Sequence, residues 1–322
     1  TGKDEVLFLE ELHDEIKSTL YHDIDFYRNK YYSKTIESDL IKEFEKKKAH
    51  IISLYPITTW MINQLAKKKV GYFKKQAEIG KTKREELSTN GGLLNQIICL
   101  LLNIDFNLQG VNRLISSYTG DTYNVGGLSL ELSISNSKWW ETNYSAYSQK
   151  PKTNYYHFDE SISKPKAIVY LTDVEKEGGP VKYVERFENI LKISNLQSIV
   201  GRVIGNIART KKSKIYHLFN HKYHQTFGCP EFINFFNMLP SELKFSSHIG
   251  WDIIPGSELE SRIIKEEKIL TGLKGKALIF DGSELLHRGG MVEKGSRVVL
   301  QVIFEKKQRF HIIKKLYRKL LK

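Results

Sequence analysis

The fold is decided by residues 297–304, RVVLQVIF, and by the stretch before them, residues 277–290, ALIFDGSELLHRGG. Each stretch contains a run rich in Val, Ile and Leu, which is typical of a strand buried on both faces. The run at residues 277–280 ends in a turn, DGSE, and a histidine follows that turn at position 287. The pattern predicts a β domain with polar residues at the end of a buried strand.

Similar short runs extend back along the chain. Alternating or apolar segments predict strands at residues 128–134, 155–159 and 167–171, and strand patterning begins at about residue 112. We therefore expect a mainly β protein with added helices, of the α+β class.

Residues 5–80 have a different pattern, with apolar side chains at helical spacing among many Lys and Glu. Two such series are Leu9, Leu12, Ile16 and Leu20, and then Ile41, Phe44, Ile51 and Leu54. Two or three amphipathic helices are predicted here. A loop at residues 88–92 and a buried helix over residues 93–102 follow.

The chain is therefore divided into three regions. Residues 1–110 form a helical region packed on the core, residues 111–305 form the β domain, and residues 306–322 form a basic amphipathic helix. A mixed, basic stretch at about 184–247 is interpreted as a helical lid inserted in the β domain. The last region carries eight Lys or Arg, which suits it to an anionic membrane surface, although its apolar stripe would equally pack on the domain.

Composition limits the partners. The 322 residues carry a net charge of +13 with 40% apolar side chains, so a positive field should attract anionic molecules. No nucleic-acid-binding module is apparent, and nucleic acid is therefore not expected. Two distant cysteines, the absence of a signal-peptide pattern and short apolar runs favour a cytoplasmic location, with peripheral contact to the inner face of the cytoplasmic membrane through residues 306–322.

A metal site is predicted from three residues. His157 and Asp159 stand two positions apart in a strand-like run, so their side chains project from one face. His287 is the best candidate for a third ligand. Two imidazoles and one carboxylate form a facial triad that leaves three positions open, as iron(II) needs to bind a 2-oxoacid and dioxygen.

Arg297 follows His287 by ten residues and opens the final apolar strand. A guanidinium pointing into a barrel requires a carboxylate partner, and the distal carboxylate of 2-oxoglutarate would bind it in a bidentate manner.

With these residues in this order, the sequence resembles the phytanoyl-CoA dioxygenase-like family of iron(II)- and 2-oxoglutarate-dependent oxygenases. Residues 166–174, KAIVYLTDV, and 178–180, GGP, add to the resemblance, which spans about residues 150–305. It implies a double-stranded β-helix, or jelly roll. It also implies iron ligands at His157, Asp159 and His287, a 2-oxoglutarate anchor at Arg297 and a cosubstrate amide at Asn154. After Pro180 the chain departs from the family's Pro-Gly-Ser-His turn, so no substrate contacts are carried over.

The resemblance implies hydroxylation coupled to oxidative decarboxylation of 2-oxoglutarate by O2, with ascorbate as an accessory reductant. Halogenation is not expected, because halogenases of this type replace the carboxylate ligand and Asp159 is present. Charge favours an anionic small molecule or glycolipid as substrate. A sugar acid of the bacterial envelope, such as the lipopolysaccharide sugar Kdo, is preferred over acyl-CoA or another small metabolite.

Other interpretations stay open. The same three residues could serve a zinc hydrolase, or the barrel could be a non-catalytic binding protein. His217, His221 and His224 lie at i, i+4 and i+7 and could form a second metal site. Because lysines surround these histidines, contact with a phosphate or sugar acid, or plain hydrogen bonding in a lid helix, is the stronger interpretation.

Overall fold

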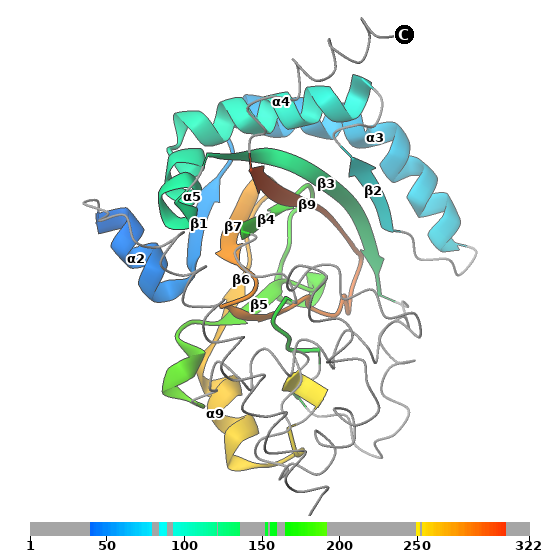
Figure 1. Cartoon of the computed structure of the whole chain (residues 1–322). Coiled ribbons are helices and arrows are strands. Elements are labelled where there is room, and N and C mark those ends of the chain that lie inside the picture. Colours follow the sequence, from blue (N-terminus) through cyan, green and yellow to red (C-terminus); the bar gives the residue numbers. More distant parts are fainter. Residues whose placement is uncertain are drawn as a thin grey trace, which may run out of the picture.

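The protein consists of two antiparallel sheets with helices over the larger one (Figure 1). The structure is a computed structural model, and it describes residues 39–78, 84–88, 93–120, 122–135, 152–153, 155–159, 165–191, 249–251 and 253–306.

Among the described residues, six strands form the large sheet and three form the small one. The large sheet has the order β1-β7-β4-β9-β3-β2, and the small sheet has the order β6-β5-β8. The bounds are β1 Ala49–Ser53, β2 Arg84–Ser88, β3 Tyr123–Ile134, β4 Pro165–Tyr170, β5 Val181–Val184, β6 Glu267–Leu270, β7 Lys276–Asp281, β8 Leu286–Arg288 and β9 Ser296–Lys306. After β4 the chain passes to β5 and β6 in the small sheet, returns to β7, and then crosses to β8 and back to β9. This winding between two sheets is the predicted double-stranded β-helix.

Both faces of the large sheet are buried, which explains the nearly continuous apolar runs. In β4, Ala167 and Val169 join the helix-side core, whereas Ile168 and Tyr170 join the core between the sheets. In β9, Val298 and Leu300 face the helices, whereas Val299 faces the small sheet. Side chains that alternate between two apolar layers produce a strand without a polar face.

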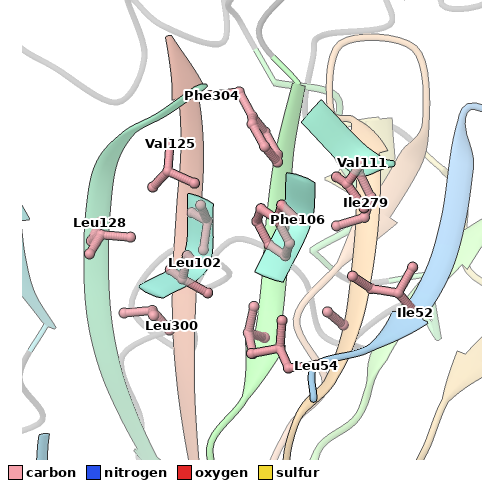
Figure 2. Packing of buried hydrophobic residues seen from close by; sticks show 14 of the residues in the cluster. Ile52, Leu54, Leu102, Phe106, Val111, Val125, Leu128, Ile279, Leu300 and Phe304 are labelled. Carbon is pink, nitrogen blue, oxygen red and sulfur yellow. The ribbon is translucent and has the colours of Figure 1, made fainter. Parts of the chain in front are cut away.

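Four helices cover the large sheet on the side away from the small sheet (Figure 1). They are α2 Asp39–Lys47, α3 Pro56–Glu78, α4 Leu93–Leu108 and α5 Val111–Thr119. Figure 2 shows Leu102 and Phe106 of α4 against the strands, with the Phe106 and Phe304 rings 5.6 Å apart. The helix predicted at residues 93–102 is therefore present and extends one to two turns further, but it is buried on one side only, since Leu93 and Leu100 are exposed.

A third apolar cluster lies on the outer side of the small sheet. Helix α9, Glu258–Glu266, contributes Ile263, which clusters with Tyr156, Val184 and Leu286. The short 3-10 helices η3, Phe187–Asn189, and η6, Ile249–Trp251, lie in the same region, and η2, Lys176–Gly178, precedes β5. This cluster fixes the segment that carries His157.

The second helical series predicted near the N-terminus is only half right. Ile41 and Phe44 are buried in α2, but Ile51 lies in strand β1, which pairs with β7 at the edge of the large sheet. The helix ends because Lys48 adopts a left-handed conformation, with φ 58°. Residues 49–53 then add an edge strand, a tertiary contact that helical spacing cannot reveal.

Two strand predictions are corrected. No strand begins at residue 112, because residues 111–119 form α5 between Gly110 and Gly120, both in the left-handed conformation; β1 and β2 come earlier in the chain, and β3 is the next strand. Residues 155–159 form no strand but a single bridge, His157 to His287. The pairing with β8 does not continue, because Tyr155 is in the left-handed conformation with φ 67° and the Asp159 amide donates to the Gly282 carbonyl instead of to β8.

Some predictions lie outside the described residues. They concern the segment before residue 39, most of the loop at 88–92, the lid beyond residue 191, and the basic tail after residue 306. The division at residues 110 and 305 stays a prediction, and β1 and β2 of the N-terminal region belong to the large sheet. Among the described residues, no helix is long and apolar enough to cross a membrane.

Candidate metal centre

The structure brings His157, Asp159 and His287 together. His157 and His287 exchange both backbone hydrogen bonds, with N to O distances of 3.0 and 3.1 Å. The Asp159 amide donates to the Gly282 carbonyl at 2.7 Å. Residues 155–159 are thus bound to both ends of the turn between β7 and β8, and this pairing places all three side chains at one point.

The side-chain geometry suits a single cation. The ligand atoms of the three residues all lie within 4.8 Å of one another. Asp159 Oδ1 is 3.9 Å from His157 Nε2 and 3.8 Å from His287 Nε2. Two imidazole nitrogens and one carboxylate oxygen at these separations could hold a metal with open positions on the remaining side.

Backbone carbonyls orient both imidazoles. His157 Nδ1 lies 3.0 Å from the Tyr155 carbonyl, and His287 Nδ1 lies 2.8 Å from the Leu285 carbonyl. A carbonyl can only accept, so each Nδ1 carries the proton and each Nε2 keeps its lone pair. Burial, with a smaller contribution from His157, lowers the pKa of His287 to about 3, so this imidazole is neutral at pH 7. Both rings are thus prepared to bind a metal through Nε2.

The two oxygens of Asp159 have separate environments. Oδ1 faces the imidazoles, whereas Oδ2 pairs with Lys166 Nζ at 2.5 Å. Burial alone would raise the pKa of Asp159, but Lys166 and then the two imidazoles outweigh burial and hold it well below its usual value. The carboxylate is ionised and turned so that one oxygen is available to a metal. Sequence analysis missed Lys166, whose position on β4, after the predicted ligand pair, could have suggested it.

Gly282 makes room for this carboxylate. A Cβ atom at position 282 would lie 1.6 Å from Asp159 Oδ2. Only glycine permits the backbone of the β7–β8 turn to approach Asp159 so closely. The glycine was quoted in the decisive stretch, but its contact partner was not foreseeable.

Two networks of polar side chains support the ligands from behind. Asp281, fully buried, accepts from Tyr118 Oη at 2.8 Å and from Ser283 Oγ at 2.6 Å, and so shapes the turn that contains Gly282. On the other side, Glu267 accepts from Tyr156 Oη at 2.6 Å and pairs with Arg288 at 2.5 Å. Tyr156 and Arg288 adjoin His157 and His287 in the chain, so this network fixes both histidines.

Arg297 is buried at the start of β9, on the same face of the strand as Val299 and thus between the sheets. Its Nη1 donates to the Gly179 carbonyl and its Nη2 lies 3.3 Å from Ser133 Oγ. Its Nε has no hydrogen-bond partner, and no carboxylate of the described residues forms an ion pair with it. A buried cation with an unused donor fits a site for a ligand carboxylate.

Gly179 belongs to the glycine-proline turn quoted for the resemblance. Its φ is 74°, and a Cβ there would meet the Gly290 carbonyl at 2.8 Å. The turn therefore packs against the segment between His287 and Arg297 and holds the carbonyl that Arg297 contacts. Asn154 and the histidines at 217, 221 and 224 lie outside the described residues.

The site is the kind of centre that the sequence predicted, a two-histidine, one-carboxylate group in a double-stranded β-helix. No model of a known protein family matches the chain, and no curated protein matches it significantly. Similar solved structures include the non-haem alpha ketoglutarate dependent carbocyclase SnoK from nogalamycin biosynthesis, with 9% identity, a TM-score of 0.40, and coverage of 87% of this chain and 91% of SnoK.

Two further similar structures contain 2-oxoglutarate. HygX from Streptomyces hygroscopicus, with nickel and 2-oxoglutarate bound, is 10% identical with a TM-score of 0.40, covering 85% of this chain and 88% of its own. EctD from S. alaskensis, with 2-oxoglutarate and 5-hydroxyectoine, is 8% identical with a TM-score of 0.43, covering 84% and 76%. At identities this low, function must be argued from the chain's own residues.

Proposed function

We propose that the protein is an iron(II)- and 2-oxoglutarate-dependent oxygenase that hydroxylates a C–H bond. Its main support is the group of His157, Asp159 and His287, whose metal-facing atoms are Nε2, Oδ1 and Nε2. Iron bound there would supply the activation of dioxygen and the decarboxylation of 2-oxoglutarate.

The chain's own residues contribute binding and orientation. The two carbonyls that accept from Nδ1 fix the ring orientation of both imidazoles, so that both Nε2 atoms are aimed at one point. Lys166 pairs with Asp159 Oδ2, so the carboxylate would offer a metal only its Oδ1 atom. Three ligand atoms leave room for the two oxygens of a 2-oxoacid and for dioxygen.

Arg297 would bind the distal carboxylate of 2-oxoglutarate. On β5, Tyr183 pairs with His287, whereas Gly179, which contacts Arg297, lies four residues earlier. Arg297 Nη2 lies 3.7 Å from where a Cβ of Gly289 would be, and Gly289 follows His287 by two residues, which span roughly 7 Å when extended. The anchor and the triad are therefore separated along the barrel, as a ligand with carboxylates at both ends requires.

The test is anaerobic reconstitution with iron(II) and 2-oxoglutarate. We expect a weak metal-to-ligand absorption band in the visible that is absent from His157→Ala and weakened in Arg297→Ala. Tyr183→Phe, which alters a buried residue beside His287 without removing a ligand, serves as the control and should keep the band.

Two competing functions predict different results. A zinc hydrolase at the same residues would show zinc-supported activity without oxygen and would be indifferent to Arg297→Ala. A non-catalytic barrel would form no succinate with any substrate. An absent band in the wild-type protein, with correct folding, would refute the oxygenase proposal.

For the substrate we propose an anionic molecule, and within that class a glycolipid or sugar acid of the bacterial envelope. The support is the net charge of +13. Substrate-dependent succinate release should be compared for a Kdo-type sugar acid, an acyl-CoA and neutral analogues of each. A preference for the neutral compounds would refute the charge argument.

A further inference from the structure

The outer face of the helical layer carries a row of exposed apolar side chains. They lie on α4 at Leu93, Leu100, Ile104 and Leu108, which are 72, 59, 50 and 69% exposed. Together with the half-buried Ile97, which lies between Leu93 and Leu100, these residues are three to four positions apart. This spacing places them on one side of the helix. The opposite side of α4 is buried against the large sheet. The surfaces of monomeric globular proteins rarely expose so many large apolar side chains along one side of a helix.

This apolar row has no charged member. The only charged residue of α4 is Asp105, which is fully buried and accepts from the Tyr55 amide at 2.9 Å. The row extends over the 16 residues of α4, or roughly 22 Å of helix.

Helix α3 lies beside α4 in the same layer (Figure 1) and adds positive charge. Its buried side, with Ile62, Ala66 and Phe73, faces the sheet. Among its exposed residues are four lysines, Lys67, Lys68, Lys74 and Lys75. Trp60, 58% exposed, lies on the same helix. The outward sides of the two helices thus place a row of apolar side chains next to a group of cations and an aromatic ring.

We propose that this face of α3 and α4 docks on the surface of an anionic lipid bilayer. The apolar row would enter the boundary between headgroups and acyl chains, while the lysines would contact anionic headgroups. A second copy of the chain fits less well, because stacking two such faces would bring both lysine groups into one interface. The helices lie on the far side of the large sheet from the metal-binding residues, so docking leaves the space between the sheets open.

The test is flotation of the full chain with vesicles, without metal or cosubstrate, so that its outcome is independent of the proposed reaction. We expect binding to mixed phosphatidylglycerol and phosphatidylcholine vesicles and none to phosphatidylcholine alone. Lys67→Glu/Lys68→Glu should reduce binding by at least about 10-fold, since each basic residue near the surface contributes roughly a 5-fold effect.

The matched control is Lys265→Glu/Lys268→Glu, which changes the net charge equally at exposed positions of α9 and β6. It should leave binding unchanged, because α9 and β6 lie on the opposite side of the large sheet from α3 and α4 (Figure 1). Leu100→Gln/Ile104→Gln should weaken binding without any change in charge. Equal losses from both lysine pairs, a binding constant insensitive to the leucine and isoleucine changes, or a dimer that these changes dissociate would each overturn the proposal.

Discussion

Gly282→Ala should destroy the metal centre while leaving the fold in place. The added Cβ would lie 1.6 Å from Asp159 Oδ2 and 2.6 Å from Asp159 Cγ. Because non-bonded heavy atoms approach to about 3.5 Å at best, the carboxylate would have to move by about 2 Å. Metal ligands tolerate displacements of only about 0.2 Å. The substitution therefore removes one of three ligands.

The effects on binding and on stability should differ in size. We expect the affinity for iron(II), or for cobalt(II) as a spectroscopic substitute, to fall by at least about 100-fold. This loss exceeds the roughly 10- to 100-fold loss that follows substitution of a residue that only hydrogen-bonds to a ligand. The displaced group is the end of a side chain, so relief of the clash should cost about 1–3 kcal/mol in free energy of unfolding. Metal titration followed by absorbance and thermal unfolding measure the two quantities.

Gly289→Ala is the control, because a Cβ there has Arg297 Nη2 as its nearest neighbour at 3.7 Å, an ordinary contact. Adding Asp159→Ala to Gly282→Ala removes the clash and should restore the stability but not the metal. Wild-type metal affinity in folded Gly282→Ala would refute the assignment of Asp159 as a ligand.

Three further predictions follow from other parts of the structure. Arg297→Lys keeps the charge but not the forked donors, so the KM for 2-oxoglutarate should rise by about 10-fold with a smaller change in kcat, as steady-state kinetics can measure. Burial alone would raise the pKa of Glu267, but Arg288, Tyr156 and Lys182 together lower it. The stability contributed by this carboxylate should therefore be constant above about pH 4.5 and decline below it. Denaturant titrations at several pH values should show that Glu267→Gln flattens this decline. Phe106→Ala, at the centre of the helix-side core, should cost about 3–5 kcal/mol in the free energy of unfolding, and a loss below 1 kcal/mol would contradict the packing in Figure 2.

Sequence patterns were sufficient where a residue's environment repeats along the chain. The runs inside β4, β7 and β9 are apolar at nearly every position because both faces of the large sheet are buried there, so composition alone identified them as strands. Helix α4 was also predictable as a helix, but one side of its apolar run is exposed, so the expectation that it is buried was only half right. The three metal-binding candidates were predictable because few residue types bind metals, and because their order along the chain matched the order in the family that the sequence resembles.

Other features depend on partners far away in the sequence. Strand β1 exists because β7 offers an edge, and the pairing of residues 155–159 with β8 stops at one bridge because the Asp159 amide donates to Gly282 instead. The local sequence pattern predicts neither feature, because pairing between strands depends on which backbone N–H and C=O groups the neighbouring segment has available.

The candidate site divides in the same way. The sequence by itself determined which residues could bind a metal and a carboxylate. Only the tertiary structure decided that Lys166 pairs with one oxygen of Asp159 and that Gly282 makes room for it. Ligand identity is a property of residue type, whereas ligand orientation arises from contacts between segments that are distant in the chain and meet only in the folded protein.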